Sequence, residues 1–171
     1  MTTVSYFRIV GVFIHILLFF NMGYAQVKSS SELYRTIMGL DSILFVNGFN
    51  NCELKEMEHL IAPDLEFYHD QSGISTSKED FFKAIEQNIC GNGDKKPIRK
   101  LVANSMEVYP LYNNGVLYGA IQNGVHEFYI KEANKEVHIT GLAKFSHVFI
   151  LQEGMWQLKR VLSYDHRSPK E

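Results

Sequence analysis

Histidine and carboxylate side chains in or near stretches of alternating polar and apolar residues are the groups in this sequence best suited to proton transfer. His126 and His147 interrupt apolar and aromatic stretches, and Asp70 and Asp165 each lie beside another histidine. A half-buried histidine held by a carboxylate titrates near neutral pH and can remove a proton beside a carbonyl group. We therefore predict His126, His147, Asp70 and Asp165 as candidate catalytic residues, in which a histidine and a carboxylate act as base and orienting partner.

A second set of residues is suited to binding. Every second side chain of a strand lies on the same face. On this basis His126 shares a face with Tyr118 and Phe128, whereas Tyr164 and His166 lie opposite Asp165. The predicted ligand-binding residues are His69, Tyr118, Phe128, Tyr164 and His166.

Each of these residues also has a purely structural explanation. A histidine in an apolar stripe is often a hydrogen-bonded core residue, Tyr164 and Asp165 can bond the end of a strand, and His69 with Asp70 can cap a turn. The sequence contains no HxH, HxxxH or CxxC motif, which argues against a metal site built from histidine or cysteine. It predicts no metal and no organic cofactor.

The first 25 residues have the composition of a cleaved signal peptide. Arg8 is their only charge, and residues 9–20 form an apolar run of 12 residues, too short to span a membrane as a helix. The small residues Gly23 and Ala25 in Gly23-Tyr24-Ala25 predict cleavage before Gln26, and the alternative is an uncleaved anchor. We predict an extracytoplasmic, periplasmic or secreted protein that has no stable membrane insertion after cleavage.

The predicted mature chain, 26–171, has the length of one domain. Removing Arg8 from the 17 basic residues leaves 16 against 19 acidic residues, a net charge of about −3 that gives no reason to expect a nucleic-acid partner. Cys52 and Cys90 both lie in the exported part, where disulfides persist. A disulfide between them would close a loop of about 38 residues and contribute about 4 kcal/mol, and the alternative is two buried thiols.

Helical periodicity occupies the first part of this domain. Apolar residues at helical spacing after capping serines predict a helix over 31–47. Asn50 and Glu53 have the spacing of a capping box before a second helix over 54–61, which Pro63 ends. The stripe of the first helix consists of Leu33, Ile37, Leu40 and Leu44.

A third helix and a series of strands follow. Ser77 and Asp80 form another capping box, and Gly91 is suited to a left-handed C-cap. Period-two alternation and turn residues then predict strands. The predicted strands are 65–69, 98–109, 116–131, 137–151 and 155–167. Helices followed by strands predict an α+β fold in which three N-terminal helices pack on a curved, mostly antiparallel sheet.

This order of elements resembles the nuclear-transport-factor-2-like superfamily, which includes polyketide cyclases. The resemblance covers nearly all of 31–167 and is carried by DLEFYHD at 64–70, NICG at 88–91 and WQLKRVLSYDH at 156–166. It is closest to exported bacterial members of unknown function. The resemblance implies a cone-shaped fold with a pocket at one end, and often a homodimer through the outer face of the sheet.

Three functions are compatible with this resemblance, because the same fold supports several reactions or none. We expect binding of a small hydrophobic or carbonyl-containing molecule in the pocket. One alternative is a cofactor-free lyase or isomerase that uses a histidine–aspartate general base. The other is a dimerisation or assembly module without catalysis. The aromatic residues expected at a dimer interface are Tyr109, Tyr112, Tyr118, Phe128 and Tyr129.

Overall fold

The computed structural model describes residues 26–91 and 93–169, so the predicted signal peptide lies outside the described residues. The helical elements are α2 (Glu32–Ser42), the π-helix η1 (Ile43–Asn50), α3 (Leu54–Met57), α4 (Lys78–Ile85) and the π-helix η2 (Glu86–Cys90). The strands are β1 (Ile61–His69), β2 (Gly73–Ser75), β3 (Lys95–Leu101), β4 (Glu107–Asn113), β5 (Val116–Glu132), β6 (His138–Gln152) and β7 (Met155–Arg167). Within the described part of the chain, no helix is both long and apolar enough to cross a membrane.

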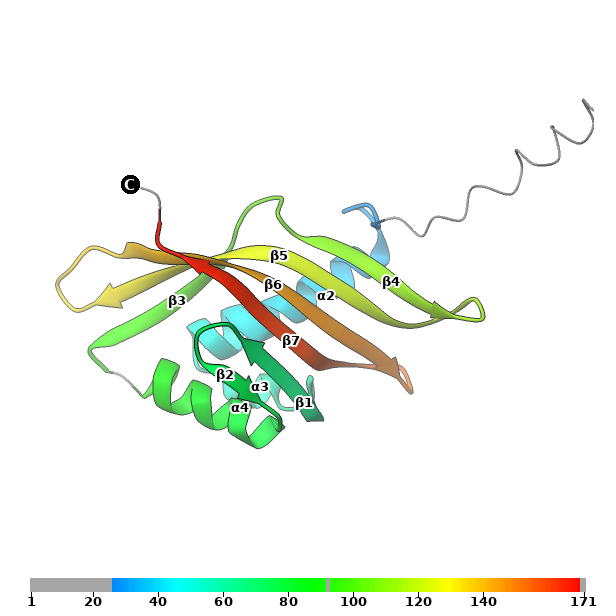
Figure 1. Ribbon diagram of the computed structural model, residues 1–171, viewed down its shortest axis with the longest axis horizontal. Coiled ribbons are helices and arrows are strands. Elements are labelled where there is room, and N and C mark those ends of the chain that lie inside the picture. The colour runs from blue at the N-terminus through cyan, green and yellow to red at the C-terminus, as the bar shows by residue number, and fades with distance from the viewer. Residues whose placement is uncertain (1–25, 92, 170–171) are drawn as a thin grey trace, which may run out of the picture.

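One curved sheet organises the molecule, and Figure 1 shows α2 lying along one of its faces. The strand order is β2-β1-β7-β6-β5-β3, and β4 also pairs with β5. All the pairings are antiparallel except that of β1 with β7, which is parallel. This architecture confirms the predicted α+β class, with few helices packed on a curved, mostly antiparallel sheet.

The first helix follows its predicted pattern. The Ser31 side chain accepts a hydrogen bond from the backbone N–H of Tyr34 and caps α2. Ile37 and Leu44 from the apolar stripe are almost completely buried, with exposed fractions of 0% and 2%. Close packing continues at Gly48 in η1, where a Cβ atom would come within 1.7 Å of the Met57 sulfur. The long first helix is thereby fixed against α3 and the sheet.

The second helix is shorter than predicted, and the prediction of a capping box at its start is wrong. It ends at Met57, and Pro63 lies inside β1 instead of ending a helix. The Asn50 side chain does not cap it. Instead, Asn50 accepts from the backbone N–H of Arg99 at 2.8 Å and donates to its carbonyl at 2.9 Å. A tertiary contact with β3 has therefore replaced the local one.

The third helix has the predicted start and a different end. Ser77 Oγ accepts from the backbone N–H of Asp80 at 3.1 Å, which confirms that capping box. The helix then continues as η2, and Gly91 follows it with a right-handed φ of −79°, not in the left-handed conformation that was predicted. The predicted strand over 98–109 is also two strands, β3 and β4, separated by a turn at Asn104.

The predicted disulfide between Cys52 and Cys90 is present. It joins the segment after η1 to the end of η2, so the two helical segments that flank the interior of the cone are covalently linked. The Lys96 ammonium group donates to the Phe49 carbonyl at 2.7 Å and lies 3.1 Å from the Cys52 sulfur. Burial lowers the pKa of Lys96.

Candidate functional site

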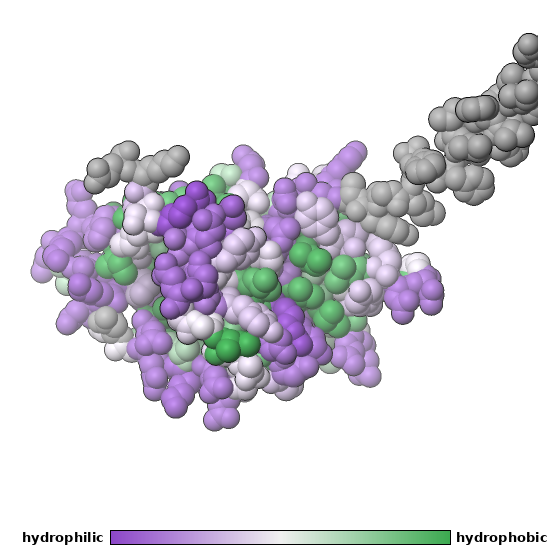
Figure 2. All heavy atoms as spheres, in the orientation of Figure 1, coloured by the Kyte–Doolittle hydropathy of each residue, from purple (hydrophilic) through white to green (hydrophobic). Residues whose placement is uncertain are grey.

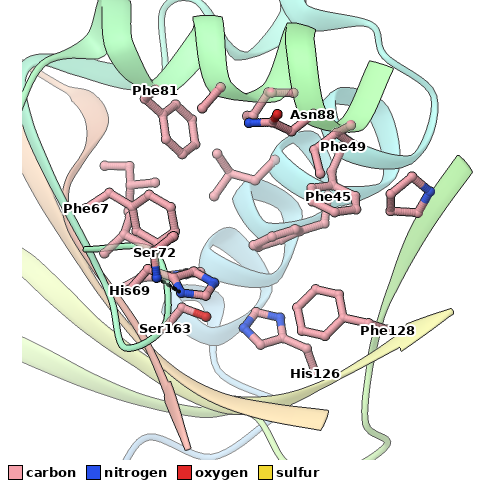
Figure 3. A pocket seen from close by; sticks show the side chains of 18 of the residues that line it. Phe45, Phe49, Phe67, His69, Ser72, Phe81, Asn88, His126, Phe128 and Ser163 are labelled. Carbon is pink, nitrogen blue, oxygen red and sulfur yellow. Dashed lines mark hydrogen bonds between the residues drawn. The ribbon is translucent and has the colours of Figure 1, made fainter. Parts of the chain in front are cut away.

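A cavity of about 440 Å³ lies between the concave face of the sheet, η1 and α4. This aromatic cavity is lined mostly by apolar side chains, and Figure 3 shows phenylalanine rings from several elements pointing into it. The rings belong to Phe45, Phe49, Phe67, Phe81 and Phe128. The exposed lining residues Gln71, Ser72 and Asn88 mark its opening. Its volume and lining are typical of small-molecule sites.

Two bulges in β7 decide which of its side chains reach the cavity. One extra residue lies between the pairs formed by Leu158 and Arg160, and another lies near Asp165, whose φ is +59°. Each bulge shifts the alternation by one residue. Consequently Leu158, Val161, Ser163 and His166 all line the cavity, at spacings of three, two and three residues. The predicted grouping of Tyr164 with His166 on one face is therefore wrong.

The mouth cluster, formed by His69, Asp70, Ser163 and His166, lies where β1 and β7 run side by side. Asp70 Oδ1 accepts from His166 Nδ1 at 2.5 Å, and Asp70 Oδ2 accepts from the His166 backbone N–H at 3.2 Å. On the other side of the ring, Ser163 Oγ lies 3.4 Å from His166 Nε2. The His69 ring stacks on His166 with centroids 4.3 Å apart.

The charges in the mouth cluster favour an ionised Asp70 beside a neutral His69. Burial opposes ionisation of Asp70, but the hydrogen bonds from His166 outweigh it, and the pKa of the carboxyl is lowered. Burial, followed by the nearby His166, lowers the pKa of His69. Because Asp70 is an acceptor, His166 carries a proton on Nδ1, and its Nε2 faces the Ser163 hydroxyl group.

A buried network extends from the wall of the cavity into the core. It consists of Asp41 on α2, Arg99 on β3, Gln122 and His126 on β5, and His147 on β6, each with an exposed fraction of 5% or less. Arg99 donates to both carboxylate oxygens of Asp41, at 2.8 and 3.0 Å, and its Nε donates to His126 Nδ1 at 2.6 Å. Gln122 links Asp41, at 2.9 Å, to His147 Nδ1, also at 2.9 Å.

This network keeps His126 and His147 neutral. Burial and the nearby Arg99 guanidinium lower the pKa of His147 to about 3. The same two causes, in the same order, strongly lower the pKa of His126. A group with so low a pKa is a weak base at neutral pH. His126 and His147 are thus suited to hydrogen bonding. The expected pairing of a histidine with a carboxylate occurs instead between His166, which was predicted as a ligand-binding residue, and Asp70.

The structure separates the predicted site residues into two groups. His69, His126, His147, Phe128 and His166 line the aromatic cavity, and Asp70 is bonded to His166 at its mouth. The remaining three are outside the cavity. Asp165 pairs with Lys144 at 3.0 Å and with Arg167 at 3.1 Å. Tyr164 lines a shallow groove on the other face of β7, and Tyr118 is exposed at a bulge in β5.

Sequence reasoning missed Asp41, Arg99, Gln122 and Ser163 as site residues. One signal was available for Asp41, which falls between Ile37 and Leu44 on the buried stripe of α2. A charged residue at a core position requires a buried partner. That partner, Arg99, lies 58 residues further along the chain, and no local pattern identifies it.

Three residues of the mouth cluster are of the types that bind metal ions in proteins. His69, Asp70 and His166 offer ligand atoms within 4.8 Å of one another. However, the two imidazole planes are stacked and differ by only 21°. The lone pairs of each ring lie in its own plane, and the two planes are nearly parallel and separated, so one ion cannot lie in the plane of both rings. The cluster would have to open before both rings could hold one ion.

The comparisons with known proteins identify the fold. No family model and no curated protein matches the sequence. A nuclear-transport-factor-2-like superfamily protein from Salmonella enterica matches with a TM-score of 0.59 and 14% identity, over 80% of this chain and 91% of that one. ActVI-ORFA from Streptomyces coelicolor matches with a TM-score of 0.64 and 11% identity, over 80% and 98%.

A further solved structure agrees with these two. An NTF2-like protein from Cytophaga hutchinsonii matches with a TM-score of 0.58 and 15% identity, over 78% of this chain and 98% of that one. The chain therefore has the nuclear-transport-factor-2-like fold, as the resemblance of its sequence predicted. Since fewer than one residue in five is identical, the likeness concerns the fold alone.

Proposed function

We propose that this protein binds a small, mostly apolar molecule in the aromatic cavity and orients it through the few polar groups there. The supporting observation is the cavity itself, about 440 Å³ in volume and lined mainly by aromatic and aliphatic side chains. Its two most deeply buried polar groups, His126 and His147, are held neutral. An uncharged ligand with a carbonyl or hydroxyl group fits this environment better than an ion does.

We further propose that the protein works outside the cytoplasm. The disulfide between Cys52 and Cys90 is compatible with an oxidising compartment. The signal peptide predicted at 1–25 supports the same location. N-terminal sequencing of the exported protein should begin at Gln26, and a sequence beginning at Met1 would contradict cleavage.

Proton transfer without a cofactor is the second candidate function, and the pairing of Asp70 with His166 favours it. Asp70 fixes the proton of His166 on Nδ1, so Nε2 can accept a proton from a carbon or hydroxyl group of a bound molecule. The resulting imidazolium would be stabilised by the Asp70 carboxylate. In this reading Asp70 and His166 form the general base that the sequence assigned to His126 or His147.

Substitution of His166 by Gln distinguishes the two functions. A binding protein should retain its ligand with only a modest change in affinity, because the aromatic lining is intact. An enzyme that uses His166 as its base should lose turnover while its fold and ligand binding persist. Far-ultraviolet circular dichroism would verify that the variant is folded.

The predicted homodimer is a third, structural proposal. The Tyr109 and Tyr129 hydroxyl groups donate to neighbouring glutamates, whereas Phe128 lines the cavity and is not available to a partner. Figure 2 shows separate hydrophobic areas divided by hydrophilic side chains on the face in view. Light scattering at tens of micromolar should show a dimer, and a monomer would contradict this proposal.

Non-denaturing mass spectrometry tests the principal proposal. The mature protein, isolated without reductant from the exported fraction of its native host, should carry an extra mass of a few hundred daltons. Ala84→Trp, which places an indole in the cavity, should abolish that mass. Lys83→Trp is the matched control, because Lys83 is exposed on the same helix. An equal extra mass on both variants would contradict binding in the aromatic cavity.

A further inference from the structure

The buried network fixes which ring nitrogen carries the proton in His126 and in His147, and that nitrogen differs between the two rings. At His126 the neighbouring group is the guanidinium of Arg99, which remains protonated and can only donate. Its Nε–H points at His126 Nδ1 at a distance of 2.6 Å. Nδ1 must therefore accept, and the proton of the neutral His126 ring resides on Nε2.

The orientation of the Gln122 amide determines which ring nitrogen of His147 carries the proton. The Asp41 carboxylate is an acceptor, so the Gln122 atom 2.9 Å from Asp41 Oδ1 is the amide nitrogen. The amide oxygen then faces His147 Nδ1 at 2.9 Å. An oxygen acceptor requires a donor, so the proton of His147 resides on Nδ1 and its Nε2 carries a lone pair.

The Nε2 atoms of His126 and His147 both face the aromatic cavity. His126 and His147 line it, although their exposed fractions are only 3% and 1%. Within the described residues, neither Nε2 atom has a hydrogen-bond partner in the protein. Every fully buried side-chain nitrogen or oxygen in these residues does have a partner. The small exposed area of each ring must therefore include Nε2. Figure 3 shows the His126 ring at the wall of the cavity, next to Phe128.

Phe45 holds the two imidazoles in these positions. Its ring stacks on His147, with centroids 5.8 Å apart and planes 16° apart, and meets His126 edge-on at 5.4 Å. The Arg99 guanidinium lies 3.8 Å from the centroid of the same ring. The centroids of the two imidazoles are 6.5 Å apart, so both can contact one small molecule.

We infer that the ligand is an uncharged hydroxy-carbonyl compound, whose carbonyl oxygen accepts from His126 Nε2 and whose hydroxyl group donates to His147 Nε2. This inference rests on the proposed binding function and specifies its ligand class. A carboxylate would satisfy His126 but would face the lone pair of His147. An apolar ligand without polar groups would leave both buried nitrogens unpaired, which is unfavourable.

The tautomers are directly measurable by two-dimensional NMR of the protein labelled with ¹⁵N in its histidines. The result expected at pH 7 is a proton on Nε2 of His126 and on Nδ1 of His147. His126→Gln and His147→Asn assign the two sets of signals. The same tautomer on both rings, or a doubly protonated ring, would overturn the inference without affecting the proposal that the cavity binds apolar molecules.

Calorimetry with four naphthalene probes tests the ligand class. The probes are 3-acetyl-1-naphthol, 2-acetylnaphthalene, 1-naphthol and naphthalene, which share one ring system and differ in their polar groups. We expect 3-acetyl-1-naphthol to bind about fivefold more tightly than either singly substituted probe, since each hydrogen bond contributes about 1 kcal/mol. His147→Asn should reduce the advantage given by the hydroxyl group, and Ala84→Trp should abolish binding of all four.

The possible outcomes separate this inference from the proposal on which it rests. Binding of naphthalene and the other three probes with equal affinity would overturn the hydroxy-carbonyl class and leave the apolar cavity as the binding site. Failure of all four probes to bind, naphthalene included, would overturn the binding function and the inference together.

Discussion

Acidification from pH 7 to pH 5 should destabilise this protein mainly through His126 and His147. Both histidines have an ordinary pKa of 6.5 in the unfolded chain, but burial and Arg99 lower it in the folded chain, to about 3 for His147. Below pH 6.5 the unfolded state therefore binds protons that the folded state does not, and stability falls as the pH falls. For His147 this loss continues down to its folded pKa of about 3.

The size of the effect follows from linkage. At pH 5 each histidine that stays neutral only in the folded state lowers the free energy of unfolding by about 2 kcal/mol, so the pair lowers it by about 4 kcal/mol. That is a large part of the 5–15 kcal/mol typical of a domain. The lowered pKa of Asp70 has its effect only below its ordinary value of 3.8 and does not contribute in this range. Urea unfolding at both pH values, with the disulfide intact, measures the difference.

A matched pair of variants isolates the buried histidines. In His147→Asn the amide nitrogen can replace Nδ1 as donor to Gln122 but does not titrate, so this variant should show about half of the acid-dependent loss. His138→Asn removes an exposed imidazole and should leave the loss unchanged. A loss below about 1 kcal/mol in the unsubstituted protein, or an equal loss in both variants, would refute the neutral, buried state of these rings.

Three further substitutions test the packing around the site, and urea unfolding measures each. Asp41→Asn leaves the buried Arg99 without its carboxylate and should lower the free energy of unfolding by about 3–5 kcal/mol, whereas a loss below 1 kcal/mol would show that the pair is not buried. Cys90→Ser opens the disulfide loop and should lower it by about 4 kcal/mol, and no change would contradict the bond. Gly48→Ala forces a methyl group against Met57 and should lower it by about 1–3 kcal/mol, and unchanged stability would contradict the close contact.

Local signals in the sequence were reliable where the interactions themselves are local. The capping box of Ser77 and Asp80 and the buried stripe through Ile37 and Leu44 involve residues a few positions apart. Asn50 has the same capping pattern but bonds the backbone of Arg99, 49 residues away. A pattern cannot reveal that a tertiary partner will compete successfully with a local one.

The site was harder to predict because it depends on irregular backbone. Strict alternation along β7 places Tyr164 with His166, but the bulges near Lys159 and Asp165 turn His166 inward and Tyr164 outward. The histidines were recognised as candidates, while their partners were not. Asp70 and His166 are 96 residues apart and meet only because β1 pairs in parallel with β7.

The proposal that the cavity binds a small apolar molecule is tested most directly by a crystal structure of the protein with 2-acetylnaphthalene. The account predicts density for the naphthalene rings among the phenylalanines of the aromatic cavity, with the ketone oxygen within hydrogen-bond distance of His126 Nε2. Density for the probe in the groove beside Tyr164, with the aromatic cavity unchanged, would contradict it.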